Sequence, residues 1–384
     1  MKATVLFKEF FSSEKAGGLM LIGCTIISLI AANTGWGDAY TGFWETNIGG
    51  HSVGHWINDG LMAIFFLLIG LELEREIYKG ELSDIKDAML PIFAAIGGML
   101  VPAGLFLMLN YGTPGQDGAG IPMATDIAFA LGVLSLLGKR IPTSLKVFLT
   151  ALAVIDDLGA ILVIAIFYSK TLVLANLLTS LGIFAGLIVL NRLKVKNLIP
   201  YLIGGVAMWY FMLNSGVHAT ITGVLLAFAI PFGSGDKKSP SYILQHILHK
   251  PVAFMILPVF ALANTAISLE SGVVETLSQS YSVGIALGLI VGKPLGIFLL
   301  TLAAVKLGFS KLPSDLSWKS ILGVGLLGGI GFTMSIFITL LAFDDATIVN
   351  NAKLAILLSS LAAGVIGFVV LSRTFKEVQP EENL

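Results

Sequence analysis

The chain has 384 residues, of which 56% are hydrophobic and 12% are charged, and its mean hydropathy is +0.90. Soluble proteins carry about 25% charged residues, so this composition excludes a soluble globular protein and indicates an integral membrane protein. The formal net charge of −1 gives no sign of the excess of basic residues that nucleic-acid-binding proteins carry. The single cysteine excludes a disulfide framework and a thiolate metal site. Glycine-rich phosphate loops, HExxH and GxSxG are absent, so no cofactor is predicted.

Twelve apolar segments approach the length of about 20 residues that a membrane-spanning helix needs. They show no period-two alternation, which argues against a β-barrel. The predicted spans are 16–33, 54–73, 88–110, 122–138, 147–168, 173–191, 198–213, 216–232, 251–267, 280–304, 320–342 and 354–371. No A-x-A cleavage site follows the first span, so we interpret it as a retained anchor. No soluble domain fits in the remainder, and residues 1–384 are predicted to form a single polytopic membrane domain.

The basic residues predict the orientation of these spans, because cytoplasmic loops are rich in Lys and Arg. With the N-terminus inside, all but three of the 23 Lys and Arg lie before the first span or after an even-numbered span. The exceptions are Lys170 and Lys353, which fall outside, and Lys293, which falls within a span. A miscounted span would move every later loop to the other side, so we predict both termini to be cytoplasmic. The longest outer connection, 34–53, has room for a short hairpin.

Two adjacent acids, Asp156 and Asp157, occur in the apolar segment FLTALAVIDDLGAILVIAIF. Ionisable groups at bilayer depth cost about 2.5–3.5 kcal/mol each and are usually functional or paired. A structural salt bridge to a lysine explains one of them but not both, because neighbouring residues point about 100° apart around a helix. Burial and like charge disfavour ionisation, so the pair is predicted to hold protons or exchange them for a hard cation that prefers oxygen ligands.

Two other charges also lie at bilayer depth. Asp126 follows Thr125 in GAGIPMATDIAFALG, which is either an ordinary helix start or an interrupted helix whose positive ends the acid compensates. Thr125 then offers an oxygen to an ion. Lys293, in ALGLIVGKPLGIFLL, needs a partner, for which Asp156 and Asp157 are the candidates, and it is suited to compensating negative helix ends.

The eleventh span contains five glycines in GVGLLGGIGFTMSIFI, which form either a close-packing face or a second helix break. A second break makes spans 3–5 and 10–12 two copies of one unit. The two copies enter the membrane from opposite faces, so the repeat is predicted to be inverted. Two broken helices that cross near the midplane then form an ion site.

The remaining signals are weaker. Asp59 lies near the outer end of span two as a support residue, and an acidic cluster at the inner end of that span is either a solvated face or a cation funnel. His218, in SGVHATITGV, either responds to pH or packs as a hydrogen-bonded histidine. His246 and His249 lie three apart in an inner segment, with no carboxylate close by in sequence to complete a metal site.

The segments ATDIAFALGVLSLLGKR, ALAVIDDLGAI, SGVHAT, LPVFALANT, IVGKPLGI and GGIGFTMSIFI closely resemble the bacterial NhaA family of sodium/proton antiporters. The similarity runs from FFSSEKAGG to the last span. The resemblance implies an all-α membrane fold of twelve helices with inverted repeats, in which spans 4 and 11 are interrupted and cross; this family is a known example of inverted repeats.

By this resemblance, Asp156 and Asp157 bind the transported Na⁺ and H⁺, with Asp157 as the direct cation ligand. Asp126 and Lys293 compensate the charges of the broken helices, and Thr125 belongs to the site environment. Residues that match positions tied in the family to pH control are Glu72, Arg75, Glu76, His246 and His249, and we add His218 as a candidate. The chain departs from the family pattern at Gln245, at Glu74, and in a short outer hairpin near 46–52.

The sequence therefore predicts an electrogenic, pH-regulated antiporter of the bacterial inner membrane that exports Na⁺ or Li⁺ for more than one H⁺, with a homodimer implied by the resemblance. An alternative is a sodium-coupled symporter of an organic solute, although the spans offer few Asn, Gln or Arg for its pocket. An intramembrane aspartyl protease is a second alternative, but its GxGD context is missing, and a carboxylate tandem beside a buried lysine is not what a two-carboxylate hydrolase requires. We therefore predict a transporter and not an enzyme.

Overall fold

The computed structural model describes residues 2–169, 172–268 and 272–375, and is almost entirely helical. Lys170 and Lys376, used above for orientation, lie outside these ranges. In chain order the elements are α1 (Lys2–Ala32), α2 (Gly37–Glu45), β1 (Asn47–Ile48), β2 (His51–Ser52), α3 (Val53–His55), η1 (Trp56–Leu61), α4 (Met62–Lys79), η2 (Glu81–Ser83), α5 (Ile85–Asn110), η3 (Gln116–Met123), α6 (Ile127–Leu136), η4 (Gly138–Arg140), α7 (Thr143–Phe167), α8 (Leu174–Arg192), α9 (Ile199–Leu213), α10 (Ile221–Ala229), α11 (Pro240–Pro251), η5 (Val252–Ile256), α12 (Leu257–Asn264), α13 (Val273–Ser278), α14 (Ser280–Leu287), η6 (Gly288–Gly292), α15 (Lys293–Lys306), α16 (Trp318–Gly328), α17 (Phe332–Ala342) and α18 (Ala346–Thr374).

Eight helices of the described chain are long and apolar enough to cross a membrane, and up to ten if each of two bent pairs is one span. The bent pairs are α1 with α2, at 114°, and α16 with α17, at 47°. Each of the twelve predicted spans contains helix, but the seventh and eighth are short. α10 has nine residues, about 14 Å at 1.5 Å per residue, because the chain before it turns at Gly216, whose φ is +86°. Length alone therefore supports fewer spans than the twelve expected.

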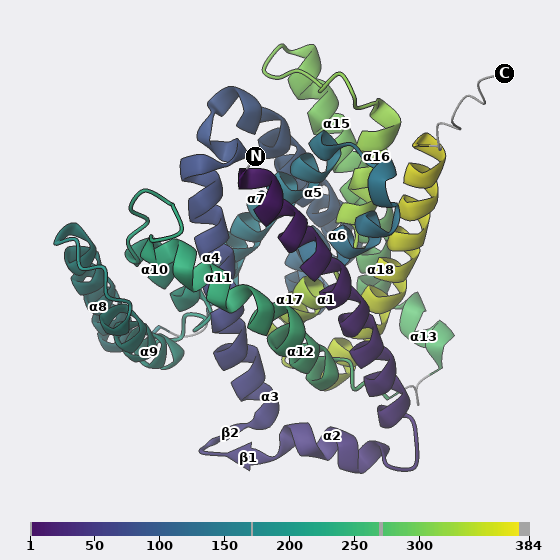
Figure 1. The fold of residues 1–384 in the computed structure, drawn as a ribbon. Helices are drawn as coiled ribbons and strands as arrows, with labels where there is room; N and C mark the ends of the chain where they lie inside the picture. The colour runs from purple at the N-terminus through teal and green to yellow at the C-terminus, as the bar shows by residue number, and fades with distance from the viewer. Residues whose placement is uncertain (1, 170–171, 269–271, 376–384) are drawn as a thin grey trace.

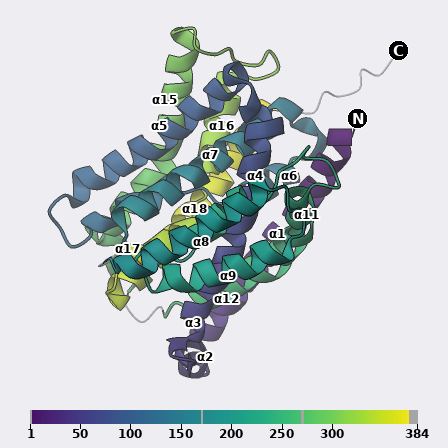
Figure 2. The same ribbon diagram turned by 90° about the vertical axis from the view of Figure 1, so that its left-hand side faces the viewer.

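The helices form one bundle, with α8 and α9 at its left-hand edge in Figure 1 and running side by side in Figure 2. The predicted outer hairpin is present: β1 pairs antiparallel with β2, and together with α2 it lies across one end of the bundle. A large apolar cluster fills the bundle, and a smaller one joins α8, α9 and α10 to one side of α4. α4 therefore connects the two clusters.

Both helices expected to be interrupted are interrupted. Residues 124–126 between η3 and α6 are not helical, and the chain leaves the helix again between Gly328 and Phe332. The two breaks touch, because the backbone N–H of Asp126 donates to the carbonyl of Ile330 at 2.7 Å. This contact brings the polar backbone ends of four half-helices to one place inside the bundle.

Two glycines set how closely α15 approaches α5. A Cβ added to Gly97 would lie 2.1 Å from the carbonyl oxygen of Gly296, and a Cβ added to Gly296 would lie 2.0 Å from the carbonyl oxygen of Gly97. The neighbouring Gly98 faces the side-chain stem of Lys293. The close approach therefore brings the buried lysine to its position.

Gly97→Ala should separate α5 from α15 and destabilise the protein by about 1–3 kcal/mol, the usual cost of overpacking. The measurement is the melting temperature of the purified protein in detergent. Gly104→Ala, on the same helix, is the matched control, because nothing lies within 4 Å of an added Cβ there. Equal melting temperatures for the two variants would contradict the packing argument.

Candidate ion-binding site

Asp156 and Lys293 form an ion pair inside the bundle. Asp156 lies on α7 and Lys293 begins α15, both side chains are 0% exposed, and Nζ lies 2.8 Å from Oδ2. The lysine also donates to the carbonyl of Met123, the last residue of η3. Its charge therefore meets both a carboxylate and the negative C-terminal end of a half-helix.

A local distortion of the helix precedes the lysine. The π-helical turn η6 runs to Gly292, and Pro294 follows Lys293. Proline removes one backbone N–H and its ring displaces the carbonyl four residues earlier, which accounts for the wider turn. Such π-turns occur frequently at functional sites.

Thr125 connects Asp156 with the other broken helix. Its hydroxyl lies 2.8 Å from Oδ2 of Asp156 and 2.9 Å from the carbonyl oxygen of Gly328, at the end of α16. A hydroxyl has one proton to donate. It can therefore satisfy both oxygens only when Asp156 is protonated and donates to the hydroxyl.

Asp126 lies where two half-helices begin. Its carboxylate accepts from the N–H and the hydroxyl of Thr333 at 3.1 and 2.5 Å, and from the N–H of Phe129 at 2.9 Å. These donors belong to the first turns of α17 and α6, where the helix dipole is positive. Both of its oxygens accept hydrogen bonds, and the residue is 2% exposed, so one buried carboxyl meets the positive ends of both half-helices.

Asp157 lies beside Asp156 on α7 and has very different surroundings. It is 1% exposed, and neither of its carboxylate oxygens has a hydrogen-bond partner among the described residues. Oδ1 of Asp156 is also without one. Three buried oxygens thus lack partners next to a pair of broken helices. Buried carboxylate oxygens without partners are costly unless they bind a proton or a cation.

Comparisons with known proteins identify the family of the chain. Residues 8–371 match the model of a family described as Na⁺/H⁺ antiporter 1. The chain belongs to this family. It is an Na⁺/H⁺ antiporter, a transporter of the bacterial inner membrane that crosses the bilayer several times.

Several relatives cover nearly the whole antiporter. The Na⁺/H⁺ antiporter NhaA of Flavobacterium psychrophilum is 73% identical over 376 residues, which is 98% of each chain. That of Cytophaga hutchinsonii is 62% identical, over 98% of this chain and 97% of the relative. Among solved structures, the sodium proton antiporter MjNhaP1 of Methanocaldococcus jannaschii matches 96% of this chain and 100% of its own with a TM-score of 0.55. Its 15% identity makes this a likeness of fold alone.

The hairpin end of the bundle holds Asp59, which meets two histidines. Its carboxylate lies 3.1 Å from Nε2 of His55 and 3.6 Å from Nδ1 of His218. The ring of His218 also packs against Phe337 of α17 at 6.0 Å between centroids. His218 therefore packs and pairs at the hairpin end, away from the other residues considered for pH control.

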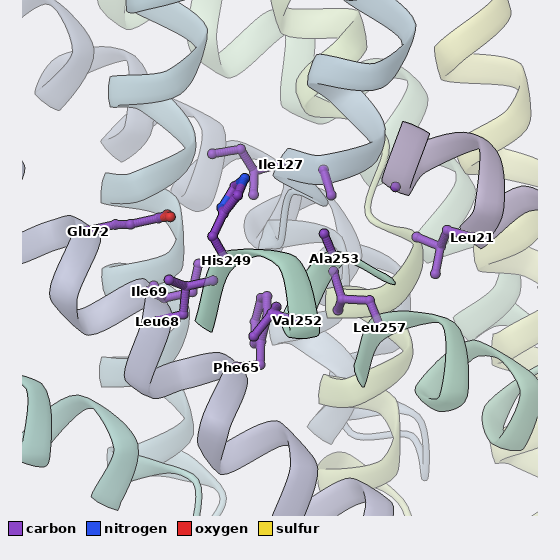
Figure 3. A pocket seen from close by; sticks show the side chains of 12 residues that line it. Leu21, Phe65, Leu68, Ile69, Glu72, Ile127, His249, Val252, Ala253 and Leu257 are labelled. Atoms are coloured by element: carbon purple, nitrogen blue, oxygen red, sulfur yellow. The ribbon is translucent and has the colours of Figure 1, made fainter. Parts of the chain in front are cut away.

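Farther from the hairpin along α4, Glu72 and His249 come together. Figure 3 shows both side chains pointing into one pocket, whose remaining walls are apolar residues of α1, α4, α6, η5 and α12. Arg75 lies over the ring of Tyr242, 6.0 Å from its centroid, and His246 stacks on the same ring at 6.3 Å. Glu76 accepts the backbone N–H of Glu81 of η2 at 3.0 Å. Four of these five candidates thus meet where α4 contacts α11, and Glu76 joins α4 to η2.

Sequence reasoning missed several residues of the broken helices. The hydroxyl of Ser360, on α18, accepts the N–H groups of Gly331 and Phe332 at 3.2 and 3.1 Å. The hydroxyl of Ser335 donates to the carbonyl of Ile121 at 2.7 Å. Thr333 was open to prediction, because it follows the glycine run. Ser360 had no sequence signal, since it reaches the break from a separate helix.

Ser360→Ala should leave two N–H groups at the start of α17 without their acceptor, at a cost of about 1–2 kcal/mol. The expected result is a lower melting temperature in detergent. Ser372→Ala is the control on the same helix, because its hydroxyl bonds to the carbonyl of Val369, one turn earlier in α18 itself. A melting temperature equal to that of Ser372→Ala would show that Ser360 does not stabilise the break.

Proposed function

We propose that the antiporter exports Na⁺ or Li⁺ in exchange for more than one H⁺, and that Asp156 and Asp157 bind both ions. The observation that carries the proposal is the set of three buried carboxylate oxygens that have no hydrogen-bond partner among the described residues, beside a lysine that pairs with Asp156. A hard cation prefers oxygen ligands, and the same oxygens bind protons. Proton and cation therefore compete for one site, with Asp157 as the direct cation ligand.

The first proton of the exchange binds Asp157, and the second binds the pair formed by Asp156 and Lys293. When Asp156 is ionised, it pairs with Lys293 and accepts from Thr125. When Asp156 is protonated, it donates a hydrogen bond to the hydroxyl of Thr125, which in turn donates to the carbonyl of Gly328. Protonation of Asp156 thus changes a contact at the broken helix, which links proton binding to movement of the half-helices.

Exchange of one cation for more than one proton moves net charge across the membrane. The membrane potential then contributes about 2.3 kcal/mol per net charge per 100 mV. An inward proton gradient and an inside-negative potential both favour sodium export. This exchange serves Na⁺ and pH homeostasis.

The fold proposed for this cycle is a single domain of twelve spans, with spans 3–5 and 10–12 as inverted repeats and spans 4 and 11 crossing at their breaks. The contacts of Asp126 with Ile330 and Thr333 support the crossing. Asp126 and Lys293 compensate the opposite ends of the half-helices. Both termini are cytoplasmic, which agrees with the start of α1 and the end of α18 lying away from the hairpin end in Figure 1. The outer hairpin provides the surface for a homodimer.

Regulation by pH is proposed for the inner contacts of α4 with α11, which involve Glu72, Arg75, His246 and His249, and for the contact of Glu76 with η2. His218 is proposed to contribute from the outer side, through Asp59. Because imidazoles change charge between about pH 5 and pH 8, these contacts are suited to respond within the working range.

The experiment is dissipation of a pH gradient in everted vesicles on addition of Na⁺, Li⁺ or K⁺. We expect Na⁺ and Li⁺, but not K⁺, to release protons, and we expect the rate to rise when an imposed potential assists net charge movement. A rate that does not respond to potential would refute the exchange of more than one proton per cation.

A further inference from the structure

A buried carboxyl outside the ion site, Glu74 of α4, has no counter-charge. The residue is 4% exposed, and its Oε2 has no hydrogen-bond partner in the part of the chain that the structure describes. None of the ion pairs between described residues involves it. An ionised carboxylate in such a place is strongly unfavourable. The carboxyl therefore stays neutral, or the surrounding contact opens to water.

The position of Glu74 on α4 is fixed by the residues one turn before and after it. An added Cβ on Gly70 would lie 2.6 Å from Cβ of Ala227 on α10. The ring of Tyr78 packs on that of Phe232, 4.9 Å between centroids. Residues four apart lie on one helix face, so Glu74 faces the chain between Ala227 and Phe232. This is where α10 ends, at Ala229.

The C-terminal end of a helix attracts a protonated carboxyl and repels an ionised one. The last carbonyls of α10 carry partial negative charge. A protonated carboxyl can donate a hydrogen bond to such an oxygen, whereas a carboxylate is repelled by it. The proton therefore determines whether the contact between α4 and α10 is favourable.

α10 contains no titratable residue, so it supplies no positive charge to its contact with α4. Glu72, two residues earlier and about 200° around the helix, faces the inner pocket with His249, and Arg75 lies over Tyr242. The titratable and charged groups on the other packed elements and on α4 itself are Asp59 of η1, Tyr242, His246, His249 and Lys250 of α11, Asp236, Lys237 and Lys238 of the exposed loop before it, Glu81 of η2, Lys146, Asp156 and Asp157 of α7, and Glu72, Arg75, Glu76, Tyr78 and Lys79 of α4.

We propose that Glu74 is a proton-binding site separate from Asp156 and Asp157, which holds α4 against α10 when protonated and loosens this contact when ionised. Glu74 thus lies where the small apolar cluster of α8, α9 and α10 packs on α4. The same helix carries Glu72, which lines the inner pocket. It adds to the pH regulation proposed above, but its test does not use transport. A failure of the inference is therefore distinct from a failure of the proposed function.

The test introduces one reporter thiol at the end of α10, as Ile230→Cys in a Cys24→Ala background, in the full-length protein. Ile230 is 0% exposed, and Cys24 is the single cysteine of the chain. The labelling rate by a water-soluble maleimide is compared between the Glu74 protein and Glu74→Gln at each pH, so that the pH dependence of the thiol itself cancels. We expect this ratio to rise at least ~tenfold between about pH 6 and about pH 9. Asp87→Asn, which removes an exposed carboxylate at the same end, should leave the labelling rate unchanged.

A ratio that stays within ~twofold of one across this range would overturn the proposal. A second measurement covers the case in which the reporter variant does not fold. Infrared difference spectra between low and high pH are recorded for the protein with Ile230 intact and for its Glu74→Gln variant. Asp156 and Asp157 contribute equally to both spectra, so subtracting the Glu74→Gln spectrum from that of the Glu74 protein should leave one protonated-carboxyl band, which belongs to Glu74. The absence of any such band from this double difference would equally overturn the proposal.

Discussion

Asp157→Asn should lower Na⁺-dependent proton flux by at least about 100-fold, which corresponds to about 2.7 kcal/mol. Both oxygens of this carboxylate are buried without hydrogen-bond partners among the described residues. The amide has nearly the same size, so packing on α7 is kept. It can neither release a proton nor carry the negative charge that a cation needs, and both halves of the exchange are lost.

The measurement is the initial rate of Na⁺-driven proton release in proteoliposomes that contain equal amounts of each protein. Asp38→Asn, in the exposed first turn of α2, is the matched control for a carboxylate-to-amide change and should keep the full rate. Full sodium-dependent flux in Asp157→Asn would remove this residue from the ion site.

Asp156→Asn should destabilise the protein by about 3–5 kcal/mol, because it leaves the charge of Lys293 buried without its carboxylate. Lys293→Gln should cost less, since Asp156 can then take up a proton and become neutral. The double variant should be more stable than the sum of the two single effects predicts, because it leaves neither charge unpaired.

This cycle is measured as free energies of unfolding in mixed detergent micelles at one fixed pH. Strictly additive effects would show that the ion pair between Nζ and Oδ2 contributes no coupling. The pair would then be a packing contact, and the proposed exchange of a proton at Asp156 and Lys293 would lose its physical basis.

The sequence predicted which charges lie buried in the bundle, because the cost of an ionisable group in a bilayer makes each one conspicuous. For each helix break, at Thr125 and Asp126 and in the glycine run of span eleven, the residues left an alternative open, and the family resemblance implied the interruption. The sequence also left open whether Asp156 or Asp157 pairs with Lys293. That choice depends on the rotation of α7 relative to α15, which tertiary packing determines.

Other features could not be read from the chain because they depend on distant segments. Ser360 caps the start of α17 from another helix. The backbone carbonyl of Met123 accepts a hydrogen bond from Lys293, and a backbone acceptor has no sequence signature. The apolar content of 216–232 indicated a full span, but only Ile221–Ala229 is helical there. Hydropathy indicates whether a segment lies in an apolar environment or in water, and it does not determine the backbone conformation of that segment.

If Na⁺ and H⁺ compete for Asp156 and Asp157, the binding of sodium must release protons. Na⁺ is added to the purified antiporter in weakly buffered detergent solution, and the protons released per protein are counted. We expect release of about one to two protons, and none from the Asp156→Asn, Asp157→Asn double variant. Sodium binding by the unaltered protein without proton release would show that the two ions do not share these carboxylates.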